Sequence, residues 1–137
     1  MDDAVARFRA ASEAFDIGEM MSLLAPDAEL VSPISGRMVF RGHDDLRILL
    51  AAVYGSFSSL KWTEDVGGGS VRVVLGQATV GRLRLTDAMV FDLADDGSIQ
   101  RLRPQLRPWL PLTVLALKLG PKIARHPAIV RRALRRA

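Results

Sequence analysis

Residues 82–93 read Arg-Leu-Arg-Leu-Thr-Asp-Ala-Met-Val-Phe-Asp-Leu, and Asp95-Asp96-Gly97 follows after one alanine. Polar and apolar residues alternate along this stretch, which is typical of a strand with one face turned to a core. The Asp-Gly pair is a strong signal for a hairpin turn. We therefore predict a long strand over Arg82–Leu93 that pairs antiparallel with a last strand from Ser98 to about Leu106.

One acidic residue, Asp87, falls on the apolar face of this long strand, together with Leu85, Met89 and Phe91. An acid among apolar neighbours is costly unless it has a hydrogen-bond partner or stays protonated. Two interpretations are open at this point. Asp87 is either a structural residue bonded to the backbone or a catalytic general acid or base.

The segments before this strand predict helices first and a sheet afterwards. Val5, Phe8, Ser12 and Phe15 have the spacing of one helix face. The order helix–helix–strand–strand–helix–strand–strand–strand–strand indicates an α+β fold with a mostly antiparallel sheet. After that first helix, we predict a short helix over Met20–Leu24 stopped at Ala25–Asp27, strands over Ala28–Ser32 and Met38–Phe40, a third helix from Gly42 to about Ser58, and strands over Leu60–Val66 and Val71–Val80.

Other polar and aromatic residues suggest a pocket on the same apolar side. Period-two alternation puts Gln77 on one face with Val71, Val73 and Leu75, which suits a cavity with a few convergent polar groups. Glu64 shares a face with Trp62, but its place near a hairpin end favours solvent. We expect Tyr54 and Trp62 to be core or pocket wall. His43 starts a helix, where a histidine is more often a cap than a base.

Composition narrows the chemistry. The chain has 137 residues, which corresponds to one domain, and it contains no cysteine and two histidines. Disulfide, thiolate and multi-histidine chemistry are therefore excluded, and we expect neither a metal nor a cofactor. The acidic start and the lack of a following apolar run argue against a signal peptide, so a cytoplasmic protein is expected.

The charge is distributed unevenly along the chain. Residues 1–100 carry a net charge of −6, whereas residues 101–137 carry ten Lys and Arg and no acid. Prolines leave room for helices at about Leu112–Leu119 and Pro121–Arg136. The favoured interpretation is a lid on the domain or on a partner subunit. Peripheral membrane contact is possible but not favoured. Nucleic-acid binding is not expected, because the body is acidic and no recognition motif is present.

Several short motifs occur in an order that is typical of one superfamily. They are Asp16, Leu24–Leu30, Ser32-Pro33, Phe40-Arg41-Gly42, Asp87–Phe91 and Asp96–Ile99. Over residues 4–108, the chain resembles the nuclear-transport-factor-2-like superfamily, particularly its SnoaL-like branch. That branch includes ketosteroid isomerase, polyketide cyclases and limonene epoxide hydrolase.

The resemblance implies a cone-shaped curved sheet wrapped by N-terminal helices around an apolar cavity, and a homodimer. We accordingly predict a cone domain at residues 1–108 and a basic C-terminal helical extension at residues 109–137. The expected partner is a small apolar ligand. The residues predicted to bind it are Phe8, Phe15, Ser32, Phe40, Tyr54, Trp62, Gln77 and Met89.

The family's catalytic groups carry over only in part. Ser32 stands where ketosteroid isomerase has its general-base aspartate, and Phe8 where it has an oxyanion-donor tyrosine. Asp87 falls close to its second donor. The Arg–Asp pattern of the epoxide hydrolase is also broken, because Arg84 and Asp87 are three residues apart. The resemblance therefore implies a ligand-binding protein without a complete known catalytic set. The alternative is a cyclase, isomerase or hydrolase that uses Asp87 on a polycyclic or terpenoid substrate.

Overall fold

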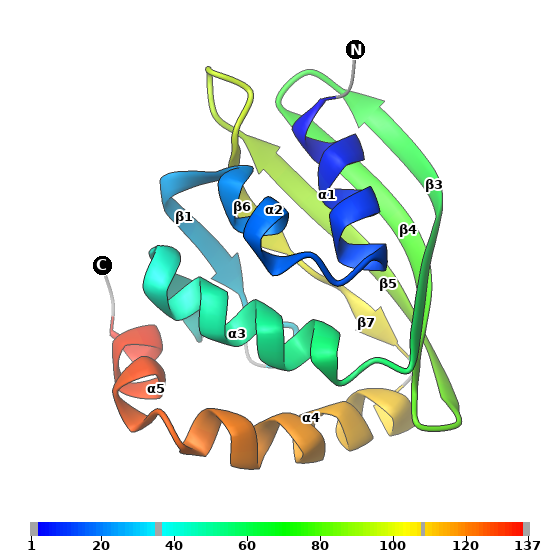
Figure 1. Ribbon diagram of the computed structural model, residues 1–137, viewed down its shortest axis with the longest axis vertical. Coiled ribbons are helices and arrows are strands. Elements are labelled where there is room, and N and C mark those ends of the chain that lie inside the picture. The colour runs from blue at the N-terminus through cyan, green and yellow to red at the C-terminus, as the bar shows by residue number, and fades with distance from the viewer. Residues whose placement is uncertain (1–2, 35–36, 108, 136–137) are drawn as a thin grey trace.

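A strongly curved sheet forms the frame of the molecule, and helices pack on its inner face (Figure 1). The computed structural model describes residues 3–34, 37–107 and 109–135. The elements in chain order are α1 (Ala4–Glu13), α2 (Ile17–Ser22), β1 (Leu24–Val31), β2 (Val39–Arg41), α3 (His43–Gly55), β3 (Ser59–Gly68), β4 (Val71–Val80), β5 (Leu83–Leu93), β6 (Ile99–Arg103), β7 (Leu106–Arg107), α4 (Trp109–Ala124) and α5 (Pro127–Leu134).

The sheet has the strand order β2-β1-β6-β5-β4-β3, and β7 pairs with β5. Only β1 and β6 pair in parallel among the described strands; the other pairs are antiparallel. The predicted α+β class and mostly antiparallel sheet are confirmed. The predicted hairpin at Asp95-Asp96-Gly97 is also present, with Asp96 accepting a hydrogen bond from the Ser98 N–H.

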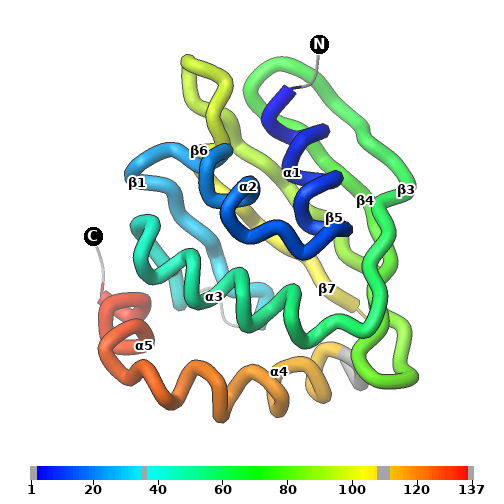
Figure 2. The backbone as a smooth tube through the Cα atoms, viewed as in Figure 1, coloured from blue at the N-terminus to red at the C-terminus, as the bar shows by residue number. Residues whose placement is uncertain are grey.

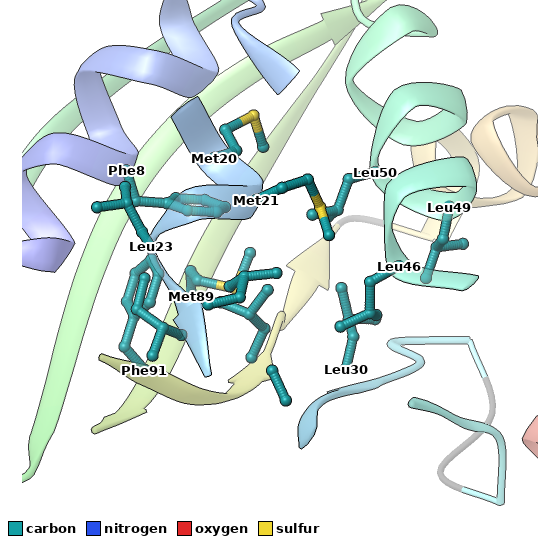
Figure 3. Packing of buried hydrophobic residues seen from close by; sticks show 14 of the residues in the cluster. Phe8, Met20, Met21, Leu23, Leu30, Leu46, Leu49, Leu50, Met89 and Phe91 are labelled. Carbon is teal, nitrogen blue, oxygen red and sulfur yellow. The ribbon is translucent and has the colours of Figure 1, made fainter. Parts of the chain in front are cut away.

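The long strand β5 alternates as its sequence predicts. Leu85, Asp87, Met89 and Phe91 are buried, and the residues between them are more exposed. Figure 3 shows Met89 and Phe91 in one cluster with Phe8 of α1. The rings of Phe8 and Phe91 meet edge to face with centroids 5.3 Å apart. The inner face of the sheet is thus packed against the N-terminal helices.

Two predicted boundaries near prolines are wrong. The segment Ala25–Asp27, expected to end a helix, belongs to β1, which already begins at Leu24. Proline is compatible with an extended backbone at an irregular position, and the β1–β6 register does shift after Leu24. The last strand divides into β6 and β7 because Pro104 between them has no N–H to donate.

The C-terminal helices also differ from their predicted limits. α4 is one helix over Trp109–Ala124 with Pro121 inside it, rather than two pieces separated there. Pro121 removes the hydrogen bond to the Leu117 carbonyl. Leu117 is 71% exposed, so water can hydrate this part of the helix. Arg136, the predicted end of the last helix, lies outside the described residues.

Polar contacts hold the C-terminal helices beside α3, and Figure 2 shows α4 running along that helix. The Lys122 ammonium donates to Ser56 Oγ at 2.8 Å. Arg132 of α5 makes two hydrogen bonds to the Asp45 carboxylate, at 2.9 and 2.7 Å. The division of the chain into domains at residue 108 stays a prediction. Among the described residues, no helix is both long enough and apolar enough to cross a bilayer.

Candidate functional site

The inner face of the sheet, α3 and α4 surround a cavity of about 300 Å³. Nearly all of its wall is apolar. The lining residues are Leu30, Ser32, Pro33, Ile34, Met38, Phe40, Leu49, Leu50, Val53, Tyr54, Phe57, Asp87, Met89, Pro104, Leu106, Leu115, Ala116, Leu119, Gly120 and Ile123. Figure 3 shows part of this wall, where Leu30, Leu49 and Leu50 lie near one another.

Asp87 is the acid in this wall. It lies in the middle of β5, opposite Gly76 of β4 and Leu106 of β7, and it is 4% exposed. Its Oδ1 atom is buried and has no hydrogen-bond partner in the described chain. Burial raises the pKa of Asp87 to about 7, although the backbone of Gln105 hydrogen-bonds the carboxylate and lowers it in part. Both protonation states are therefore accessible near neutral pH.

Tyr54 of α3 lines the same cavity. Its ring packs edge to face on Phe8 and Phe57, with centroid distances of 6.2 and 5.6 Å. Burial, and to a smaller extent the charge of Asp87, raise the pKa of the Tyr54 phenol well above its usual value. The phenol therefore stays protonated. The cavity thus contains a tyrosine O–H and a carboxyl group that can each hydrogen-bond a ligand oxygen.

Five of the predicted site residues come together at this cavity: Ser32, Phe40, Tyr54, Asp87 and Met89. The Ser32 hydroxyl accepts a hydrogen bond from the Ile34 N–H at 3.1 Å. Its role in the loop is therefore partly structural. Ser32 lies on the loop that follows β1 and adds a hydroxyl group to the cavity wall.

Three predicted aromatic residues lie elsewhere. Phe8 is fully buried in the core behind Tyr54. Trp62 is also core, and its indole N–H donates to Ser12 Oγ at 2.8 Å. Phe15 is 49% exposed and has a positive φ of 55°. It continues the spacing of α1 by sequence, but the helix ends at Glu13, so its side chain leaves the helix face.

The prediction that Gln77 points into the pocket is wrong, because Gln77 is exposed on the outer face of β4. The inner face carries Val74, Gly76 and Ala78. A Cβ on Gly76 would lie 2.5 Å from Trp62 Cε3, so the indole occupies the space over this glycine. The sequence pattern misleads here because a glycine and an alanine face the core while larger residues face outward.

The structure adds residues from α4 that sequence reasoning did not assign to the site. Leu115, Leu119 and Ile123 face the cavity, together with Ala116 and Gly120. Their three- and four-residue spacing is a visible signal of one helix face. It identifies an apolar face but not the surface that this face covers.

Other candidate groups are not at the cavity. His43 Nε2 lies 3.2 Å and 3.0 Å from the carbonyl oxygens of Leu24 and Ala25, which agrees with a structural role. Arg84 is exposed, and the pairing of β4 with β5 is regular around Asp87, so no bulge brings Arg84 to the cavity. Over residues 3–34, 37–107 and 109–135, no group of three or more His, Asp or Glu side chains is placed to hold a metal ion.

The chain was compared with models of protein families. The family model for the SnoaL-like domain matches residues 5–102. The chain belongs to the SnoaL-like family. No curated protein matches its sequence.

Solved structures with the same fold include proteins of several kinds. An uncharacterised protein with a cystatin-like fold from Silicibacter pomeroyi is 22% identical, with a TM-score of 0.87, covering 95% of this chain and 93% of its own. A steroid delta-isomerase from Pseudomonas aeruginosa is 24% identical, with a TM-score of 0.81, covering 91% and 92%. A protein from Sinorhizobium meliloti that is named as a polyketide cyclase is 21% identical, with a TM-score of 0.65. The alignment covers 77% of this chain and 95% of the Sinorhizobium protein.

These likenesses show a nuclear-transport-factor-2-like fold for this SnoaL-like chain. Coverage of 95% must include most of residues 109–137, so the C-terminal helices have counterparts in the Silicibacter protein. At these identities the comparisons establish the fold and not the activity.

Proposed function

We propose that this SnoaL-like protein binds a small, mostly apolar molecule in its cavity, with one polar group of the ligand hydrogen-bonded to Asp87. The observation that carries this proposal is the buried, unpartnered Asp87 Oδ1 on the wall of an apolar cavity of about 300 Å³. An unsatisfied buried polar atom costs about 1–3 kcal/mol. A ligand that supplies the missing partner recovers that free energy on binding.

The lining residues favour an apolar ligand. Phe40, Tyr54, Phe57 and Met89 offer broad contact surface, and the polar side chains are few. Such a wall is typical of small-molecule sites, in which a few polar groups orient an otherwise apolar ligand. The likeness to a steroid delta-isomerase makes steroids the first class to test, with terpenoids next.

A second candidate function is acid–base catalysis by Asp87 on a polycyclic or terpenoid substrate. Its support is the pKa of about 7, which lets Asp87 give or take a proton near neutral pH. Tyr54 would hydrogen-bond the oxygen on which negative charge develops. Ser32 is a poor proton shuttle, so Asp87 would have to move the proton itself.

Ligand-induced thermal stabilisation tests the binding proposal. A bound ligand at 100 times its Kd stabilises the folded state by about 2.7 kcal/mol. We expect steroids or terpenoids to raise the Tm of the wild type and to have little effect on Ala116→Phe, whose ring would fill the cavity. Asp87→Leu should bind more weakly than Asp87→Asn, because leucine cannot form the hydrogen bond. Equal shifts for wild type and Ala116→Phe would contradict binding in this cavity.

Turnover assays separate the second candidate from simple binding. If Asp87 transfers a proton, Asp87→Asn should retain ligand affinity and lose about 10²- to 10⁴-fold in kcat. Ligand binding without any turnover by the wild type would leave the binding proposal intact and contradict the catalytic one.

We also propose a homodimer formed through the outer face of the sheet. Val66 and Val71 are 55% and 43% exposed on this side of the molecule, and they would be covered by a second copy. Sedimentation equilibrium should give twice the chain mass, and Val66→Glu with Val71→Glu should reduce it to one chain. A monomeric wild type at high concentration would overturn the proposal.

A further inference from the structure

Four exposed cations lie in the C-terminal segment: Lys118 on α4, Arg125 between α4 and α5, Arg131 on α5, and Arg135 at the C-terminal cap of α5. None of these four forms an ion pair with a carboxylate in the described part of the chain. No acidic residue occurs between residue 101 and the C-terminus. This end of the molecule is therefore positively charged, and its charge is not neutralised internally.

Other cations of the same acid-free stretch have a different role. Arg101 pairs with Glu29, Arg103 with Asp92, and Arg132 with the buried Asp45. These pairs attach β6 and α5 to the body of the protein. The four unpaired cations contribute nothing comparable to the fold, which leaves them available to a partner.

Two large apolar side chains lie among these cations. Leu117 of α4 is 71% exposed and Leu134 of α5 is 54% exposed. Leu117 is on the side of α4 opposite to Leu115 and Leu119, which line the cavity. Both helices therefore combine an inner face that packs on the protein with an outer face that mixes leucine and cations. We call the outer residues the C-terminal basic surface: Leu117, Lys118, Arg125, Arg131, Leu134 and Arg135.

We propose that the C-terminal basic surface docks on anionic lipid bilayers. Cations attract the phosphate headgroups, and leucines that project from an amphipathic helix enter the boundary between headgroups and acyl chains. The exposed leucines favour a bilayer over a nucleic acid, which offers a phosphate backbone but no apolar layer. The contact is peripheral. It includes α4, which also forms part of the cavity wall. Figure 1 shows α4 at one edge of the molecule.

Vesicle co-sedimentation of the full-length protein, without added cavity ligand, tests the proposal. We expect binding to vesicles of phosphatidylcholine with phosphatidylglycerol, and little binding to phosphatidylcholine alone. Each cation near an anionic surface contributes about a fivefold change in partitioning. Arg131→Glu with Arg135→Glu should therefore lower the partition coefficient at least about 25-fold at low salt. Added salt should also lower the partition coefficient of the wild type, because salt screens the attraction between the cations and the lipid headgroups.

A matched control reverses two cations elsewhere. Arg7→Glu with Arg47→Glu makes the same change in net charge at exposed positions of α1 and α3, away from both the C-terminal basic surface and the outer face of the sheet. This control should bind vesicles far more tightly than the α5 variant. Equal losses for the two double variants would show a nonspecific charge effect and overturn the assignment of the surface.

The exposed leucines distinguish a bilayer from other polyanions. Leu117→Ser with Leu134→Ser should reduce vesicle binding and leave retention on a DNA duplex unchanged. Unchanged vesicle binding by this variant would overturn the lipid proposal in favour of a general polyanion site. No sedimentation of the wild type with anionic vesicles at low salt would also overturn it, even if the protein binds cavity ligands.

Discussion

Two acids are buried among the described residues, and their surroundings differ. Asp45 is paired with Arg132, whereas Asp87 Oδ1 has no partner. A buried carboxylate beside a guanidinium can stay charged, whereas a buried carboxylate without a cationic partner favours its protonated form. The unpaired Oδ1 of Asp87 therefore lowers the stability of the folded protein. Buried acids of this kind occur often in ligand-binding and catalytic sites.

The raised pKa of Asp87 predicts a particular dependence of stability on pH. Between the ordinary value of 3.8 and about 7, the folded protein retains a proton that the unfolded chain has lost. The free energy of unfolding should therefore fall as pH rises through this window, by roughly 4 kcal/mol at most. Asp87→Asn should remove this dependence, as measured by urea unfolding from pH 4 to 8.

The exposed Glu64 provides a control for that experiment. Glu64→Gln should keep the wild-type slope, because this side chain is solvated. A wild type whose stability is the same at pH 5 and pH 8, once the other carboxylates are allowed for, would contradict the assigned environment of Asp87.

Gly76 gives a second prediction for a single residue. Alanine at this position would place a Cβ 2.5 Å from Trp62 Cε3, and the indole is held by its hydrogen bond to Ser12. We expect Gly76→Ala to lower the free energy of unfolding by about 1–3 kcal/mol. Gly68→Ala is the control, because no atom lies within 4 Å of its added Cβ. Equal stabilities of the two variants in chemical unfolding would disprove the tight contact.

At the scale of elements, α5 depends on contacts far away in sequence. Its eight residues are few for an isolated helix, but Ile129 and Ala133 are buried against the core. Arg132 bonds Asp45 in the first turn of α3, and Arg41 donates to the Arg135 carbonyl at 3.3 Å. The helix is therefore stabilised by docking rather than by its own propensity.

Arg132→Ala should loosen α5 selectively. The substitution leaves the Asp45 carboxylate without its guanidinium partner, so the docked helix loses its main polar contact. Hydrogen exchange should become faster in residues 127–134 and stay unchanged in β4 and β5. Arg131→Ala is the matched control, because Arg131 is exposed and forms no ion pair in the described chain. Exchange that is unaffected by Arg132→Ala would show that apolar packing alone holds the helix.

At the scale of the whole molecule, the cavity is formed by segments far apart in the sequence, from Leu30 to Ile123. The sheet and α3 provide most of its wall, and α4 closes one side with Leu115, Leu119 and Ile123. The family match ends at residue 102, before α4 begins. Ligand binding in this chain is therefore expected to depend on residues outside the matched segment.

Removal of residues 109–137 tests this dependence. Leu115, Ile123 and Ile129 are 1%, 9% and 2% exposed, and they lose their burial in the shortened chain. The truncation should cost roughly 5 kcal/mol or more in the free energy of unfolding. It should also expose apolar surface, seen as increased binding of an environment-sensitive dye. If cavity ligands raise the Tm of the shortened protein as much as that of the full-length protein, the role of α4 in ligand binding is contradicted.

Sequence alone determined the order of the elements, the α+β class and the burial of Asp87. These properties follow from local periodicity, which a strand such as β5 displays directly. The same reasoning failed at Gln77, because the packing of Trp62 over Gly76 decides which face of β4 is buried. It also could not show that α4 covers the cavity. Such contacts join residues distant along the chain, and only the tertiary structure specifies which apolar faces meet.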